Sequence, residues 1–129
     1  MNRKVLILGA ILGMISIVLG AFAAHGLETL VDKDAVDTFQ IGVRYQMYHA
    51  LLLLAIGNLG NVTEKTKNAL FYLVLIGVLM FSGSIYVLST NSLTSFDFKV
   101  IGFITPIGGL LLILAWFMLL INFLKIRSE

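Results

Sequence analysis

Four long runs of apolar residues leave this chain few folds to adopt. Residues 5–24, 45–62, 69–88 and 100–124 contain no Asp, Glu, Lys or Arg. A membrane-spanning helix needs about 20 mostly apolar residues, because the hydrocarbon core is about 30 Å thick and each helical residue rises about 1.5 Å. None of the runs shows the alternation of a barrel strand. We predict an all-α integral membrane protein. One four-transmembrane-helix bundle would form a single membrane domain over residues 1–129, with helices at about 5–24, 36–59, 66–88 and 99–124.

Composition supports this class and excludes others. Hydrophobic residues make up 59% of the chain and charged residues only 12%, against about 25% charged in soluble domains. The absence of cysteine excludes disulfides and thiolate metal sites. Basic residues stand at segment ends and form no stripe among aromatics, so the expected partner is the lipid bilayer and not nucleic acid.

The distribution of Lys and Arg predicts the orientation. Six basic residues fall on the side of the N-terminus, the second loop and the C-terminus: Arg3, Lys4, Lys65, Lys67, Lys125 and Arg127. Three fall on the other side: Lys33, Arg44 and Lys99. Because basic loops remain in the cytoplasm, we predict a multi-pass protein with both termini cytoplasmic.

A cleaved signal peptide is the main alternative for the first run. Arg3 and Lys4 would form its basic region, and Ala21-Phe22-Ala23 resembles a cleavage site. The apolar run is longer than usual for a signal peptide, and its small residues lie along one helical face. We therefore favour a retained helix.

Local signals predict helix ends and packing faces. Asp34 is the expected cap of the second helix, and Thr63 begins the third after a stop at Gly60-Asn61. Pro106 should bend the fourth helix about one turn below the outer surface. Small residues should let helices approach closely, within the bundle or at an oligomer seam; these are Gly9, Gly13, Gly20, Gly77, Gly102 and Gly109.

Polar residues within the spans are the candidate functional site, because such groups are costly in a membrane. All of them are predicted to lie in the outer half: His25, Arg44, Tyr45, Gln46, Tyr48, His49, Ser82, Ser84, Tyr86, Thr105 and Pro106. Structural roles compete with function at each. The tyrosines suit an interfacial belt, Arg44 can extend to the interface or pair with Asp37, and His49 is more often an interhelical hydrogen-bonding group than a ligand.

No cofactor or metal is predicted. His25 and His49 are weak metal candidates, because the sequence predicts similar depths for them and they could bind a metal together with Glu28. A catalytic dyad of His49 with Ser82 or Ser84 would be the basis of a hydrolase hypothesis.

Four ordered motifs resemble the YgdD/YwdK-like small membrane protein family, known as domain of unknown function 423. They are GAFAAHGL at 20–27, RYQMYHAL at 44–51, FSGSIY at 81–86 and ITPIGG at 104–109. Ala23 stands where the family usually has glycine. The resemblance implies a bacterial plasma-membrane protein with four helices, and it brings no established catalytic residues.

Three functional hypotheses follow. The favoured one is a structural or accessory protein that associates with itself, as a homo-oligomer, or with other membrane proteins. The second is binding or transport of a small molecule, lipid or ion through the outer polar cluster, although no carboxylate within a span could couple protons to transport. An enzyme is the least favoured.

Overall fold

The computed structural model describes residues 2–126, and all of its regular structure is helical. Arg127, one of the six basic residues predicted to face the cytoplasm, lies outside the described residues. The predicted all-α class with four long helices is confirmed. The elements are α1 (Asn2–His25), η1 (Leu27–Thr29), α2 (Lys33–Asn58), α3 (Glu64–Ser89), η2 (Asn91–Leu93), η3 (Phe98–Ile101) and α4 (Ile104–Leu124), the η elements being short 3-10 turns.

Helix starts follow from side-chain caps. Asp32, and not the predicted Asp34, caps α2 by accepting a hydrogen bond from the Ala35 amide at 2.8 Å. Asp32 has the extended backbone that a cap requires, whereas Asp34 already lies in the first turn. Thr63 caps α3, as predicted, through the Thr66 amide.

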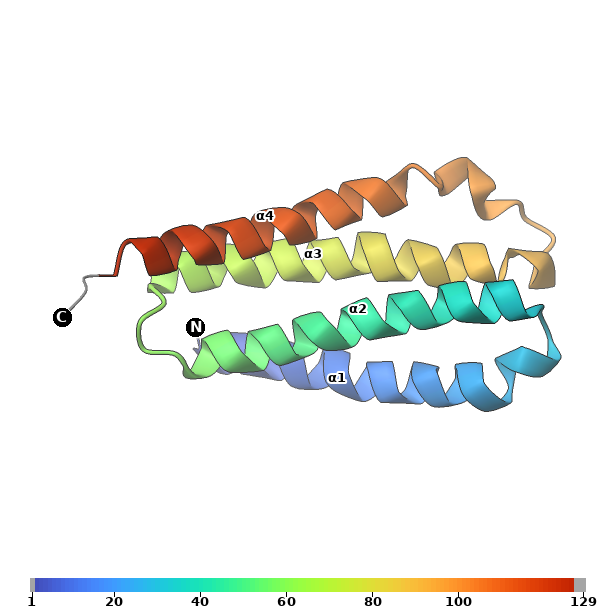
Figure 1. Cartoon of the computed structure of the whole chain (residues 1–129), viewed down its shortest axis with the longest axis horizontal. Helices are drawn as coiled ribbons and strands as arrows, with labels where there is room; N and C mark the ends of the chain where they lie inside the picture. The colour runs from blue at the N-terminus through green and yellow to red at the C-terminus, as the bar shows by residue number, and fades with distance from the viewer. Residues whose placement is uncertain (1, 127–129) are drawn as a thin grey trace.

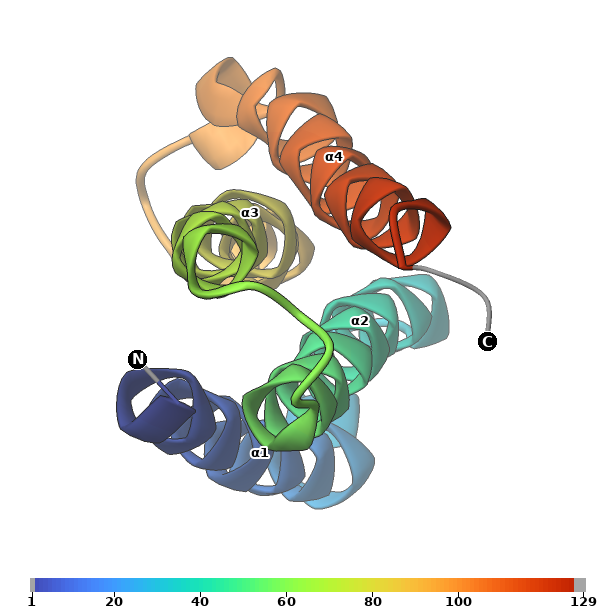
Figure 2. The ribbon, with the colours of Figure 1, turned by 90° about the vertical axis from the view of Figure 1, so that its left-hand side faces the viewer.

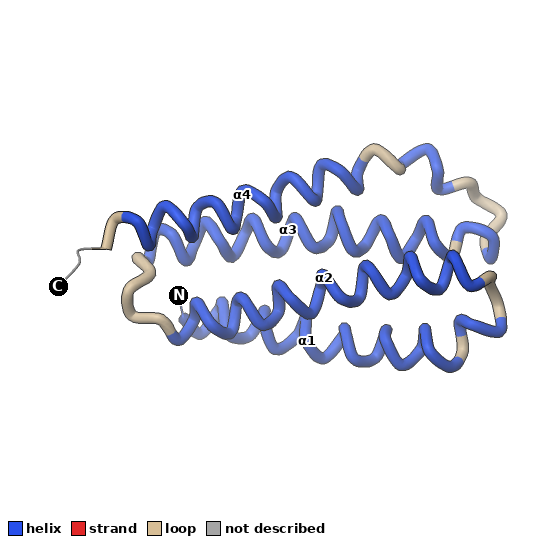
Figure 3. Tube along the Cα trace, in the orientation of Figure 1, coloured by secondary structure: helices blue, strands red, loops and turns tan. Residues whose placement is uncertain are grey.

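The fourth span is divided, and the predicted bend at Pro106 is wrong. The 3-10 turn η3 ends at Ile101, and α4 begins anew at Ile104 after a short turn (Figure 3). Pro106 therefore lies in the first turn of α4, where its missing N–H removes no intrahelical hydrogen bond. The break falls at Gly102, four residues before Pro106, where the carbonyl would otherwise meet the proline ring.

The four helices run antiparallel in chain order, and α1 begins at the same end of the molecule where α4 finishes (Figure 1). After the orientation predicted from the sequence, we call this the inner end and the opposite one the outer end. Packing is most extensive within the α1–α2 and α3–α4 pairs, and α2 joins the pairs by packing on α3. Viewed end-on, α1 and α4 lie on opposite sides of the molecule (Figure 2).

Two hydrophobic clusters hold these pairs together. The larger includes Val5, Leu53, Leu70 and Leu112 and draws on all four helices. The smaller lies toward the outer end, where Ala23 and Leu27 pack on Phe39 of α2. The central helices therefore carry most of the packing, and α1 and α4 keep apolar faces outside.

Close approach of helix backbones occurs at several glycines. A Cβ on Gly77 would lie 2.6 Å from Leu112, and one on Gly108 would meet the backbone of Met80 and Phe81. Of the other glycines predicted to pack, Gly9 is tightly placed, since a Cβ there would lie 3.0 Å from the Ala50 carbonyl oxygen. A Cβ on Gly13, Gly20 or Gly109 would make looser contacts, and one on Gly102 would meet only its own turn. Tight approaches at Gly42, Gly57 and Gly108 were not among the predicted set.

Length and composition mark three stretches of the described residues as able to cross a membrane: Asn2–Thr29, Glu64–Ser89 and Phe98–Leu124. Helix α2 is not among them, because Arg44, Gln46 and His49 lower its hydropathy. Large apolar side chains nevertheless cover the outside, with Ile17 of α1 and Ile113 of α4 about two-thirds exposed (67% and 65%). Such a surface suits lipid.

Candidate functional site

The eleven predicted site residues separate into an interior set and an outward set. Gln46, His49, Ser82 and Ser84 are buried, and Tyr86 and Thr105 are half-buried. His25, Arg44, Tyr45, Tyr48 and Pro106 are exposed on the molecular surface. The structure therefore does not gather all of them around one cavity.

Gln46 links three helices. Its side-chain amide donates to the Leu12 carbonyl of α1 at 2.9 Å, and its carbonyl oxygen accepts from the Tyr86 hydroxyl of α3 at 2.6 Å. Leu12 lies near the middle of α1, so this contact is close to the middle of the molecule and not near its outer surface. Buried interhelical hydrogen bonds of this kind each stabilise membrane bundles by about 0.6 kcal/mol, and up to about 1.7.

Ser82 makes a second α2–α3 link in the same layer. Its hydroxyl donates to the Gly42 carbonyl at 2.7 Å. The absence of a side chain at Gly42 permits this, since a Cβ there would lie 2.8 Å from the Tyr86 ring. Closer to the outer end, a hydrogen bond of 2.5 Å joins the hydroxyls of Ser84 and Thr105, and it connects α3 to the start of α4.

His49 is held from two sides. Its Nε2 lies 3.1 Å from Nε1 of Trp116 on α4, and its Nδ1 lies 2.7 Å from the Tyr45 carbonyl. The indole can only donate, so Nε2 accepts and the proton resides on Nδ1, which donates to the carbonyl. A cleft of about 260 Å³ lies beside this pair, and its apolar lining comes from Phe81 of α3 and from Leu112 and Ile113 of α4. Trp116 was not predicted as a partner, because only the fold brings it to His49.

This geometry does not support the metal or hydrolase readings. His49 lies past the middle of α2, whereas His25 is exposed at the outer end of α1, so the expected similar depth is wrong. Within residues 2–126 no group of three or more His, Asp or Glu side chains could hold a metal ion. Both ring nitrogens of His49 have partners, and Ser82 and Ser84 bond elsewhere, so no Ser–His pair forms.

The outward set lines shallow surface. Arg44 borders an open hollow of about 470 Å³ together with Asp37 and Gln40. The predicted alternative partner Asp37 pairs instead with Lys33, at 3.2 Å. The Tyr45 ring packs edge-on against Tyr48 and Phe81, as in a belt of aromatic side chains.

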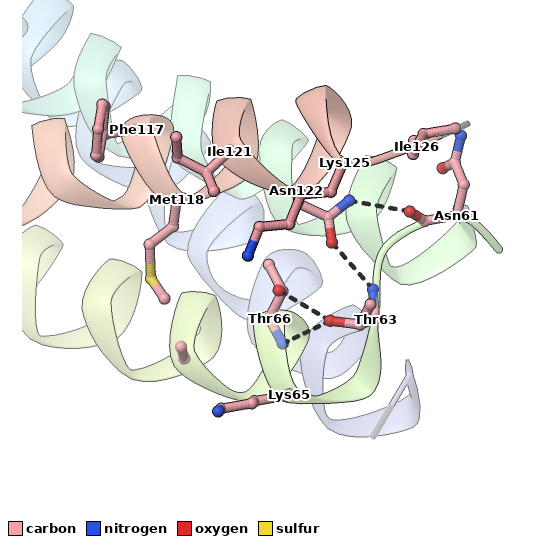
Figure 4. Close-up of a pocket in the computed structure, with 11 residues that line it drawn as sticks. Asn61, Thr63, Lys65, Thr66, Phe117, Met118, Ile121, Asn122, Lys125 and Ile126 are labelled. Atoms are coloured by element: carbon pink, nitrogen blue, oxygen red, sulfur yellow. Dashed lines mark hydrogen bonds between the residues drawn. The ribbon is translucent and has the colours of Figure 1, made fainter. Parts of the chain in front are cut away.

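Polar contacts also join the helices at the inner end. Lys67 is only 2% exposed and donates to the Asn2 side chain of α1 at 2.7 Å. Asn122 of α4 donates to the Asn61 carbonyl at 2.9 Å and accepts from the Thr63 amide at 3.3 Å (Figure 4). A cleft of about 460 Å³ opens beside Asn122, between the start of α3 and the end of α4. Neither contact was predicted, because both join segments that only the fold brings together.

The fold and this polar arrangement define a small multi-pass helical membrane protein whose internal polar groups bind one another. Residues 19–109 match the family described as Protein of unknown function (DUF423), and the chain belongs to that family. The resemblance stated from the four motifs is thereby confirmed.

Relatives cover nearly the whole chain. A UPF0382 membrane protein of Staphylococcus saprophyticus is 41% identical over 94% of this chain and 97% of its own. YwdK of Bacillus subtilis, also a UPF0382 membrane protein, is 35% identical over 93% and 95%. One from Haemophilus influenzae is 37% identical over 99% of both chains. No solved structure matches significantly.

Proposed function

We propose that this protein is a structural or accessory component of the plasma membrane that acts through helix–helix association. One observation carries the proposal. Within the described residues, every buried side-chain nitrogen or oxygen has a hydrogen-bond partner inside the chain. Because buried polar groups are costly unless paired, such a network stabilises helix positions, and within the described residues it leaves no buried side-chain donor or acceptor free for a substrate.

The proposed orientation has both chain ends in the cytoplasm. Arg3, Lys4, Lys65, Lys67 and Lys125 support it by their position at the inner end. Helix α2 would also cross the membrane, because it lies antiparallel between α1 and α3, two helices that are apolar enough to span.

The outward faces of α1 and α4 are the proposed association surfaces. Each of these helices packs extensively on one neighbour only and is apolar elsewhere. The chain has no cysteine, so single cysteines can report contacts in native membranes. We expect Ile113→Cys on α4 or Ile17→Cys on α1 to give disulfide-linked dimers under mild oxidation.

A matched control is Ser95→Cys, in the outer loop. If neither helix-face variant crosslinks above that control and mild-detergent purification returns only single copies, with no membrane partner, the association proposal fails.

A binding or transport role has one observation in its favour, the hollow in which Arg44 is available to an anionic group. Arg44→Ala should then abolish uptake or binding of that anion, while Lys33→Ala should not. An unchanged Arg44→Ala protein across a broad anion screen would exclude this alternative.

A further inference from the structure

The cleft at the inner end has the two-part character of a lipid-binding site. Its wall along α4 is apolar and comes from Phe117, Met118 and Ile121, with Ala69 of α3 opposite. Its rim is polar and carries Thr63, Thr66, Lys65 and Lys125. In Figure 4 both lysine side chains extend to the side of the cleft where Met118 lies.

The charge at this rim is positive. Glu64 is the only acidic residue at the inner end within residues 2–126, and it does not line the cleft. The single ion pair of the described residues, Lys33 with Asp37, is at the outer end. Among the described residues, Lys65 and Lys125 therefore have no carboxylate partner, and their charge can attract an anion.

The rim is also held in place. The two hydrogen bonds of Asn122, to Asn61 and Thr63, fix the end of α4 against the loop that precedes α3. The Thr63 and Thr66 hydroxyls bond to each other at 2.9 Å. These bonds hold the backbone segments that carry Lys65 and Lys125, and none of them involves a lysine ammonium group.

We propose that this cleft binds an anionic phospholipid of the inner leaflet. The phosphate lies between Lys65 and Lys125, and one acyl chain runs along Phe117 and Met118, both of which are exposed on the lipid-facing side. Charge complementarity selects the anionic headgroup, because basic groups at a membrane surface attract anionic lipids. The apolar wall favours a lipid over a soluble phosphate. The site is independent of helix association and of the outer polar residues.

The test compares lipid retention by the purified full chain. Native mass spectrometry measures binding of phosphatidylglycerol and of phosphatidylcholine with the same acyl chains. Each interfacial lysine contributes a factor of about five to attraction for anionic lipid. We therefore expect the double variant Lys65→Gln/Lys125→Gln to lose the phosphatidylglycerol preference by roughly 25-fold, and the matched outer pair Lys33→Gln/Lys99→Gln to retain it.

The role of the apolar wall of the cleft is tested in variants that keep both Lys65 and Lys125. Met118→Trp fills the cleft and should reduce retention of phosphatidylglycerol at least tenfold, whereas Leu114→Trp, one turn away on α4 and outside the cleft, should not. Circular dichroism shows whether each variant keeps its helix content.

Three results would overturn the proposal. One is a phosphatidylglycerol preference in Lys65→Gln/Lys125→Gln within twofold of the original protein. Another is full displacement of the lipid by millimolar inorganic phosphate, which would indicate a free-phosphate site. The third is an unchanged lipid affinity in a folded Met118→Trp protein. Cysteine crosslinking of α1 and α4 tests the association proposal separately. The lipid-binding proposal and the association proposal can therefore fail independently of each other.

Discussion

At the scale of single residues, the Gln46 side chain of α2 forms hydrogen bonds to two other helices, α1 and α3. We predict that Gln46→Leu lowers the free energy of unfolding in detergent by about 1–2 kcal/mol, because two interhelical hydrogen bonds are lost. Tyr86→Phe removes one of these two hydrogen bonds and should lower the free energy of unfolding by about half as much. Thermal unfolding followed by circular dichroism measures both.

Gln40→Leu is the matched control, because Gln40 lies on the same helix and its side chain makes no hydrogen bond within the described residues. Equal stability of the Gln40 and Gln46 variants would contradict the assigned role of Gln46.

The contact between His49 and Trp116 offers a spectroscopic prediction. Trp116 is the only tryptophan of the chain, so its fluorescence reports this site alone. Removing the acceptor in His49→Leu leaves the indole N–H in an apolar setting, and we expect the emission maximum to move to shorter wavelength. Tyr48→Leu, one position away and facing outward, should leave the spectrum unchanged. A spectrum of His49→Leu identical to that of the original protein would exclude the hydrogen bond.

At the scale of helices, the interface of α3 and α4 depends on Gly108. A Cβ at this position meets backbone of α3, which cannot move aside as a flexible side chain can. We predict that Gly108→Ala lowers the free energy of unfolding by about 1–3 kcal/mol, as overpacked sites do. At Gly83 a Cβ would contact nothing within 4 Å. Gly83→Ala should therefore be neutral or slightly stabilising, because alanine favours helix. The same loss in both variants would show that close approach at Gly108 is not the cause.

The helices themselves could be predicted from the sequence, because apolar runs and flanking charges act over single segments. The family, too, could be identified from the four motifs. The caps show the limit of local signals: Asp32 and Asp34 are chemically equivalent, and only the backbone conformation at Asp32 selects between them. Hydrogen-bond partners on different helices could not be predicted, because packing of distant segments brings Gln46 to Leu12 and His49 to Trp116. The outer-half site remains a prediction, although its members divide between interior and surface.

At the scale of the whole molecule, the orientation can be measured directly. In the cysteine-free chain, Ser95→Cys at the outer end should react with a membrane-impermeant maleimide in intact spheroplasts. Gly60→Cys at the inner end, where a Cβ meets nothing within 4 Å, should react only after lysis. Both sites are exposed, so accessibility within the fold does not bias the comparison. The reverse pattern would overturn the cytoplasmic placement of both ends.

The contact of Gln46 with the Leu12 carbonyl also bears on how the protein is made. Helix α2 alone would carry an unpaired amide into hydrocarbon, where each unsatisfied group costs several kcal/mol. Its acceptor lies on the helix synthesised just before it. We therefore expect the first two helices to leave the translocon as a hairpin, with α1 retained beside the channel until α2 arrives. A nascent chain lacking α1 should stall or deliver α2 to the wrong side, a fate that a glycosylation reporter fused after residue 62 would reveal.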